Sequence, residues 1–132
     1  MVRILDTDTC IEILRGNRNV LERRQSVTDE VATTWITAAE LFYGAAKSQA
    51  SARNKKLLVE FLATLRVIGM DSTAAEKFGQ IKAELEQAGQ QLADADLLIA
   101  AIALTQNATL ITGNTRHYQR VAGLQLEDWI RG

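Results

Sequence analysis

Three carboxylates of this chain lie in unusually apolar surroundings. Asp6 directly follows a short apolar run, Glu40 lies between two apolar residues, and Asp96 precedes eight consecutive apolar residues. Burying an unpaired carboxylate is costly, and none of the three has an evident local partner among the Lys and Arg residues. If the three acids converge, their mutual repulsion requires a divalent cation. Oxygen ligands without His or Cys favour Mg²⁺ or Mn²⁺ over zinc, so we predict a metal site formed by Asp6, Glu40 and Asp96.

Each of these acids also has an ordinary structural explanation. Asp6 could cap the turn at Thr9, and Glu40 could lie on the surface if the helix is rotated by one position. Asp96 could complement the dipole of its helix, with Asp94 as the N-cap. The metal-site hypothesis therefore depends on the fold bringing the three acids together.

The pattern of apolar residues and breakers predicts alternating strands and helices. Short strands are expected over residues 2–5, 31–36, 67–69, 109–112 and, less regularly, 124–126. Helices are expected over residues 9–15, 37–45, about 50–65, 72–89 and 94–107, with Thr37 and Ser72 as N-caps. This alternation predicts an α/β domain with a short parallel sheet of four to five strands, flanked by helices on both faces. Such sheets bind ligands beyond the carboxyl ends of their strands.

Length and composition exclude several other classes of protein. The 132 residues fit one domain, residues 1–132, and 47% hydrophobic residues with a net charge of −1 are ordinary for a globular protein. One cysteine, Cys10, excludes a disulfide framework or a cysteine-based zinc site. The apolar runs are too short for a membrane span, and an acid at position 6 argues against a signal peptide, so we expect a cytoplasmic protein with no membrane contact. There is no phosphate-binding GxxxxGK[ST] loop and no GxSxG elbow.

Four segments, in order along the chain, resemble the PIN domain and, within it, the VapC-type toxins of bacterial toxin–antitoxin pairs. They are Ile4-Leu5-Asp6-Thr7-Asp8, Thr37-Ala38-Ala39-Glu40-Leu41-Phe42-Tyr43-Gly44, Asp94-Ala95-Asp96-Leu97-Leu98-Ile99-Ala100-Ala101, and Leu110-Ile111-Thr112-Gly113-Asn114. The resemblance spans nearly the whole chain and continues to Asp128-Trp129. It implies a single PIN-like domain with the activity of a Mg²⁺- or Mn²⁺-dependent RNA endonuclease.

The resemblance also assigns roles to residues. The catalytic and metal-binding set that it implies is Asp6, Glu40 and Asp96. Asn114 stands where many relatives carry a fourth acid, and Asp8 stands where asparagine is usual. As secondary residues lining the site we expect Asn114, Thr112, Asp8 and Asp94.

The same resemblance implies two partners, an RNA substrate and a VapB-type antitoxin. We expect Arg116, Arg15 or Arg18 to position the RNA backbone, and the RNA to be cut in loops or single strands, as in a structured RNA such as tRNA. The antitoxin is expected to occupy a groove near Leu14, Leu41 and Leu57 and to place an Arg or Lys against the acids. We also expect a homodimer, because the helix with Leu57–Leu65 offers excess apolar surface.

Two other functions remain open at this point. Asp6-Thr7-Asp8-Thr9 also fits the start of haloacid-dehalogenase-like phosphatases, in which the first Asp is a nucleophile. That class needs a later acidic pair after a strand, whereas Asp94 and Asp96 are expected to open a helix. The second alternative is a PIN-like scaffold that binds partners without catalysis.

Overall fold

Five short parallel strands form the centre of the fold, in the order β3-β2-β1-β4-β5. The computed structural model describes residues 1–132. The strands are β1 (Val2–Leu5), β2 (Glu30–Thr34), β3 (Arg66–Ile68), β4 (Thr109–Ile111) and β5 (Gln125–Glu127). This confirms the predicted α/β class and the fully parallel sheet.

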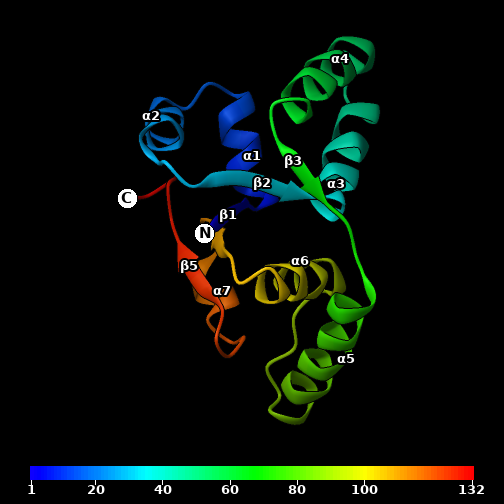
Figure 1. Ribbon diagram of the computed structural model, residues 1–132. Helices are drawn as coiled ribbons and strands as arrows, with labels where there is room; N and C mark the ends of the chain where they lie inside the picture. The colour runs from blue at the N-terminus through cyan, green and yellow to red at the C-terminus, as the bar shows by residue number, and fades with distance from the viewer.

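Helices cover both faces of the sheet (Figure 1). One face carries α1 (Thr7–Leu14), α2 (Arg18–Ser26), α3 (Trp35–Ala46) and α4 (Ser51–Leu62). The other carries α5 (Ser72–Gln87), α6 (Asp94–Thr105) and the short α7 (Thr115–Tyr118). No helix is both long and apolar enough to cross a membrane.

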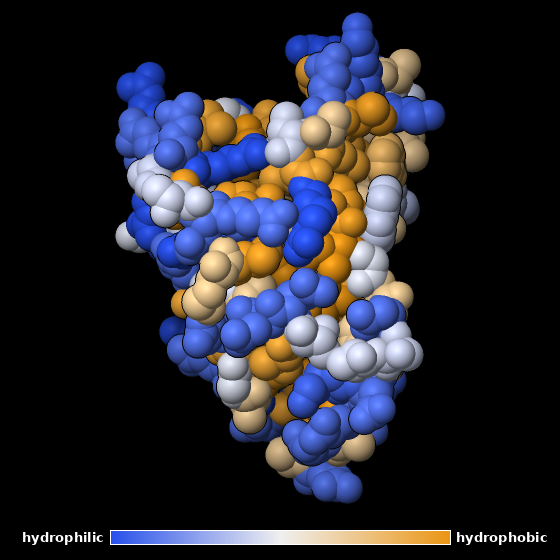
Figure 2. All heavy atoms as spheres, in the orientation of Figure 1, coloured by the Kyte–Doolittle hydropathy of each residue, from blue (hydrophilic) through white to orange (hydrophobic).

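The sheet divides the hydrophobic core into two clusters, because successive strand residues point to opposite faces. Ile4 and Leu110 pack with α5 and α6, whereas Leu5 and Ile111 pack with α1, α3 and α4. Helix α6 is buried on nearly all sides, as its continuous apolar run predicts. Figure 2 shows hydrophobic residues gathered between the projecting ends of α2 and α4, whose outer surfaces are largely hydrophilic.

Several predicted boundaries are wrong, and in each case local hydrogen bonding gives the reason. Strand β2 ends at Thr34, whose side chain accepts a hydrogen bond from the Thr37 backbone N–H at 3.1 Å, so Thr34 and not Thr37 caps α3. Asp71 and not Ser72 caps α5, through the Ala74 N–H at 2.8 Å. Helix α2 was not predicted at all, because its sequence is mostly polar and it buries only Val20.

The order of the strands determines where a ligand would bind. Strand β1 lies between β2 and β4. The chain leaves β1 toward α1 on one face of the sheet and leaves β4 toward α7 on the other face. In open α/β sheets the crevice at such a reversal point is the usual binding site. Leu5 pairs in register with Ile111, so Asp6 and Thr112 leave the sheet side by side, and the Asp6 N–H donates to the Ile111 carbonyl at 2.9 Å.

Candidate active site

A polar cavity of about 350 Å³ opens at this edge of the sheet. The acids predicted to bind metal reach it from three separate elements: Asp6 follows β1, Glu40 lies on α3, and Asp96 lies in the first turn of α6. The full lining consists of Asp6, Thr7, Asp8, Ile11, Glu40, Asp96, Gly113, Asn114 and Arg131. The fold therefore brings together three acids that are far apart in sequence.

Asp6 is the most constrained of the acids. It is buried, and it caps α1 by accepting the Thr7 N–H on Oδ1 at 2.9 Å. Its Oδ2 accepts the Thr112 hydroxyl at 2.8 Å. Burial raises the pKa of Asp6 to about 6, with a further contribution from the nearby charges of Asp8 and Asp96, and the hydrogen bonds oppose this rise. Asp6 is thus held in a fixed position in an environment that a cation would stabilise.

A buried tyrosine connects Asp6 with Asp96. The Tyr118 hydroxyl lies 3.2 Å from Asp96 Oδ1 and 3.5 Å from Asp6 Oδ1. Burial and the two adjacent carboxylates raise the pKa of Tyr118 far above its usual value, so its hydroxyl stays protonated and acts as a donor. This residue was not predicted from the sequence. Its position four residues after Asn114, one helical turn beyond the strand exit, is the signal that could have identified it.

Glu40 differs from the expectation that all three acids are buried. Its side chain is exposed, at the mouth of the cavity, and only Asp6 of the three is fully buried. Glu40 Oε1 accepts the Thr7 hydroxyl at 2.6 Å, which ties α3 to the start of α1. Its carboxylate is therefore oriented by one hydrogen bond and otherwise accessible to a ligand.

Most of the predicted secondary residues form hydrogen bonds that connect the segment after β1 with the loop after β4. Asp8 lines the cavity and accepts the Gly113 N–H on Oδ2 at 2.9 Å. Asn114 also lines the cavity, and its N–H donates to the Thr112 hydroxyl at 3.0 Å. Thr112 itself is buried behind Asp6. These contacts make one connected polar network around Asp6.

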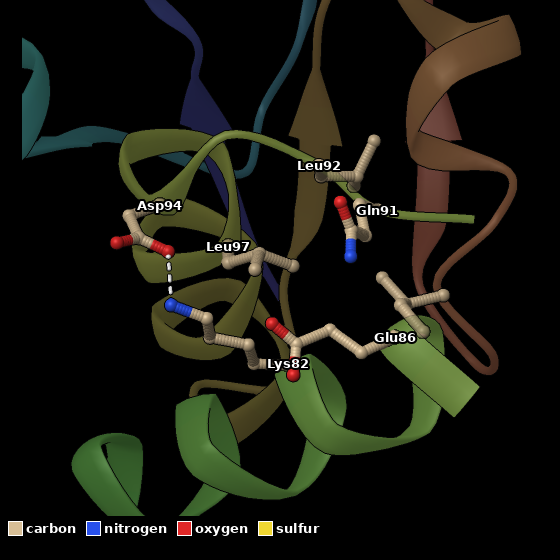
Figure 3. Close-up of a pocket in the computed structure, with 7 residues that line it drawn as sticks. Lys82, Glu86, Gln91, Leu92, Asp94 and Leu97 are labelled. Carbon is tan, nitrogen blue, oxygen red and sulfur yellow. Dashed lines mark hydrogen bonds and ion pairs between the residues drawn. The ribbon is translucent and has the colours of Figure 1, made fainter. Parts of the chain in front are cut away.

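The prediction for Asp94 was wrong. Asp94 does not line the acidic cavity but pairs with Lys82 at 2.9 Å, across a separate pocket between α5 and α6 (Figure 3). It does not cap the helix either, because Ala93 is the N-cap of α6. Asp94 and Asp96 are two residues apart on α6. Residues at this spacing point in different directions, so Asp96 reaches the acidic cavity and Asp94 does not.

The predicted arginines are also placed differently. Arg116 and Arg18 do not line the cavity, and Arg15 lines a neighbouring apolar groove. The one cation in the lining is Arg131, which the sequence analysis did not identify.

The chemistry of the cavity suits a hard divalent ion. Its ionisable ligands are all oxygen donors, and neither Asp6, Glu40 nor Asp96 forms a salt bridge within the chain. No three acidic, His or Cys side chains are arranged to hold one ion together. Mg²⁺ is usually bound through one or two carboxylates and completes its shell with water and substrate phosphates. Asp6 and Asp96, which face one hydroxyl, fit such a pair, with Glu40 at the rim.

Comparisons with known proteins agree on a family. A model described as the PIN domain matches residues 3–124. The chain is 36% identical over 127 residues to the "tRNA(fMet)-specific endonuclease VapC" of Salmonella typhimurium, covering 96% of each chain. It is 34% identical over 128 residues to "Ribonuclease VapC2" of Haemophilus influenzae, covering 96% of this chain and 97% of the relative.

Solved structures give the same result. The fold matches a VapBC2 complex from Rickettsia felis bound to a DNA fragment from its promoter, with a TM-score of 0.93 and 32% identity over 98% of this chain and 99% of the other. It matches DNA-bound VapBC from Salmonella typhimurium with a TM-score of 0.93 and 35% identity over 98% of each chain. The chain therefore belongs to the PIN-domain family and, within it, to the VapC ribonucleases.

Proposed function

We propose that this chain is the endoribonuclease toxin of a type II toxin–antitoxin pair, and that it hydrolyses RNA phosphodiester bonds with the help of Mg²⁺ or Mn²⁺. The observation that carries the proposal is the convergence of Asp6, Glu40 and Asp96 on one cavity at the reversal point of the sheet. The names of the relatives support the nuclease activity, and the oxygen-only ligand set supports the choice of ion.

The residues around the cavity would have different roles in hydrolysis. An ion at Asp6 and Asp96 would supply charge for the phosphate and lower the pKa of its bound water. Thr7, Thr112 and Tyr118 hold the two carboxylates in position through hydrogen bonds. Glu40, exposed at the rim, would orient the attacking water or help to hold a second ion. Pre-positioning of these groups is what raises the rate.

The substrate that suits this cavity is RNA with unpaired nucleotides. Proteins reach single-stranded loops and ends far more readily than bases inside an A-form helix. The Salmonella relative carries the name of a tRNA(fMet)-specific endonuclease. A structured RNA with an exposed loop, such as a tRNA, is therefore the substrate class that we propose.

Cleavage of total RNA in the presence and absence of metal tests this function. We expect defined cleavage products with Mg²⁺ or Mn²⁺ and none with EDTA, with activity returning when the metal is restored. Turnover of a small aryl phosphate is expected to be absent, because the acidic pair Asp94 and Asp96 follows a loop instead of the strand that a phosphatase of this type needs. RNA that stays intact at all metal concentrations, together with no heat of Mg²⁺ binding by calorimetry, would favour the non-catalytic scaffold.

A groove lies beside the acidic cavity, at the residues where we expect the antitoxin to bind. It has a volume of about 390 Å³ and is lined by Thr7, Ile11, Leu14, Arg15, Glu40, Leu41, Gly44, Ala45, Asn54, Leu57 and Leu58. Leu14 and Leu57 are 41% and 45% exposed, so a partner would bury substantial apolar surface there. Thr7, Ile11 and Glu40 line both the groove and the cavity. An antitoxin segment in the groove could therefore reach the acids with an Arg or Lys.

Competition between metal and antitoxin tests this mode of inhibition. We expect added Mg²⁺ to weaken the complex, and Asp6→Asn to lower antitoxin affinity, because both remove negative charge that the antitoxin cation would bind. Leu57→Asp should weaken binding at every metal concentration, since it places a charge in the apolar groove. Affinity that is independent of both metal and Asp6 would show that inhibition acts elsewhere on the surface.

We also propose a homodimer, although the exposed apolar surface of α4 is smaller than the sequence led us to expect. In α4, Leu58 and Phe61 are buried in the chain's own core. Leu57 and Val59, 45% and 49% exposed, are the large apolar residues of that helix left for a second copy.

A further inference from the structure

The segment after β5 is held firmly against the sheet. Trp129 is buried, and its Nε1–H donates to Glu127 Oε1 at 3.0 Å. Glu127 also pairs with Arg23 at 2.8 Å and with Arg3. The buried ring and the two ion pairs fix the direction in which the chain continues beyond the sheet.

Asp128 turns this segment toward the acidic cavity. Its Oδ1 accepts the N–H groups of Ile130 and Arg131 at 2.8 and 3.0 Å, and its Oδ2 lies 3.5 Å from Arg131 Nη1. The same nitrogen donates to the carbonyl of Gly113, in the loop after β4. Arg131 is therefore held at the cavity by contacts from two separate segments.

The absence of a side chain at Gly113 favours this close approach. A Cβ there would lie 2.9 Å from Arg131 Nη1 and 3.0 Å from both Asp8 Oδ2 and Ile130 Cδ1. Real Cβ atoms essentially never come as close as the first of these distances. The loop after β4 thus leaves space for the guanidinium group beside the acids.

The charge balance of the cavity indicates what the guanidinium is for. Four carboxylates line the cavity, those of Asp6, Asp8, Glu40 and Asp96, and they would repel the phosphates of an approaching RNA. Arg131 is the one cation in the lining, and its side chain is 71% exposed. Its Nε and Nη2 atoms form no hydrogen bond within the chain, so they are free to donate to phosphate oxygens, for which the planar guanidinium is well suited.

We propose that Arg131 is a substrate-binding residue of the nuclease, whose guanidinium binds a phosphate of the RNA backbone at the mouth of the acidic cavity. The inference rests on the proposed ribonuclease function. Because the contact is made before and during the reaction, it lowers KM more than it raises kcat.

Steady-state kinetics of Arg131→Gln provide the first test. On an RNA oligonucleotide taken from a mapped cleavage site, we expect KM to rise about tenfold while kcat stays within about threefold of wild type. Arg66→Gln is the matched control, because Arg66 begins β3 at the opposite end of the sheet and pairs with Glu30. That control makes the same change of charge and is expected to leave KM within about twofold of wild type.

The salt dependence of binding separates a phosphate contact from a structural role. In plots of the logarithm of affinity against the logarithm of salt concentration, Arg131→Gln should reduce the slope by roughly 0.7, the value for one phosphate of a single strand. Arg131→Lys should retain the wild-type slope because it keeps the charge. The labelled oligonucleotide is measured by fluorescence anisotropy in EDTA, where no cleavage is expected.

The outcomes distinguish this inference from the proposed function. If the wild type cleaves RNA while Arg131→Gln has an unchanged KM and salt slope, Arg131 is not a phosphate ligand and the nuclease assignment stands. A loss of kcat with unchanged KM would equally overturn the role in substrate binding. If the wild type cleaves no RNA with any divalent metal, both proposals are wrong.

Discussion

Asp6→Asn should reduce RNA cleavage by about a thousandfold or more, equivalent to about 4 kcal/mol of activation free energy. Asn keeps the size of the side chain, and its Oδ1 can still accept the hydrogen bond from the Thr7 N–H, whereas its Nδ2 can only donate to the Thr112 hydroxyl oxygen. It removes negative charge that would hold the proposed ion, so the loss of activity is expected without loss of fold. Initial rates on the same RNA, with Mg²⁺ at increasing concentrations, provide the measurement.

Asp94→Asn is the matched control for this substitution. Like Asp6→Asn, it neutralises one acid, but Asp94 lies at the start of α6 and pairs with Lys82 outside the cavity. We expect its cleavage rate to stay within about threefold of wild type. Comparable losses in the two variants would mean that the general charge of this region, and not the ligand at Asp6, supports activity.

Asp6→Asn should also stabilise the metal-free protein at neutral pH. Burial raises the pKa of Asp6 from 3.8 to about 6. At pH values between these two, Asp6 is therefore protonated in the folded state but ionised in the unfolded state. The free energy of unfolding therefore falls as pH rises from about 4 to about 6, by up to about 3 kcal/mol from this residue. In Asp6→Asn most of this pH dependence should vanish, leaving a smaller part from Asp8, whose pKa burial also raises.

Urea unfolding in EDTA at about pH 4.5 and about pH 7, on either side of the pKa of about 6 for Asp6, measures the effect. Mg²⁺ is expected to stabilise the wild type at the higher pH and to have little effect on Asp6→Asn, because ligand binding to the folded state raises stability only where the site exists. Equal responses to Mg²⁺ in both proteins would contradict a role for Asp6 as a ligand.

Trp129→Ala should lower the free energy of unfolding by about 3–5 kcal/mol, the cost typical of removing a large buried aromatic side chain. Trp129 is 1% exposed and packs in the cluster formed by α1 to α4. The substitution leaves a cavity and removes the hydrogen bond to Glu127. Trp35→Ala is the matched control, since Trp35 is 55% exposed and its loss should cost less than about 1 kcal/mol.

Denaturant unfolding of both tryptophan variants decides this prediction. Where Trp129→Ala still folds, its KM for RNA should also rise, because the ring anchors the segment that carries Arg131. A loss of stability no greater than that of Trp35→Ala would show that the segment after β5 contributes little to the fold.

The sequence by itself determined the class of fold and singled out three acids that line one cavity. Alternating apolar runs and helical stripes are local patterns, so they predicted a parallel sheet of four to five strands and the buried α6 without knowledge of the contacts between them. Asp6, Glu40 and Asp96 stood out because each combines a charge with apolar neighbours in sequence, and the resemblance to the PIN domain assigned them a common role. Helix α2 was missed because it carries little apolar periodicity and depends on the Asn17 cap.

Only the tertiary structure decided which polar groups meet. Asp94 and Asp96 are two residues apart, yet one faces Lys82 and the other faces Tyr118, because the rotation of a helix separates them. Glu40 is exposed in spite of its apolar neighbours, because Ala39 also lies on the exposed side of α3 and only Leu41 packs into the core. Arg131 lies more than a hundred residues from Asp6 along the chain and carries no local pattern, so its place at the cavity follows from the buried Trp129, the turn at Asp128 and the space at Gly113. Such contacts depend on packing between distant segments, and no spacing within one segment encodes them.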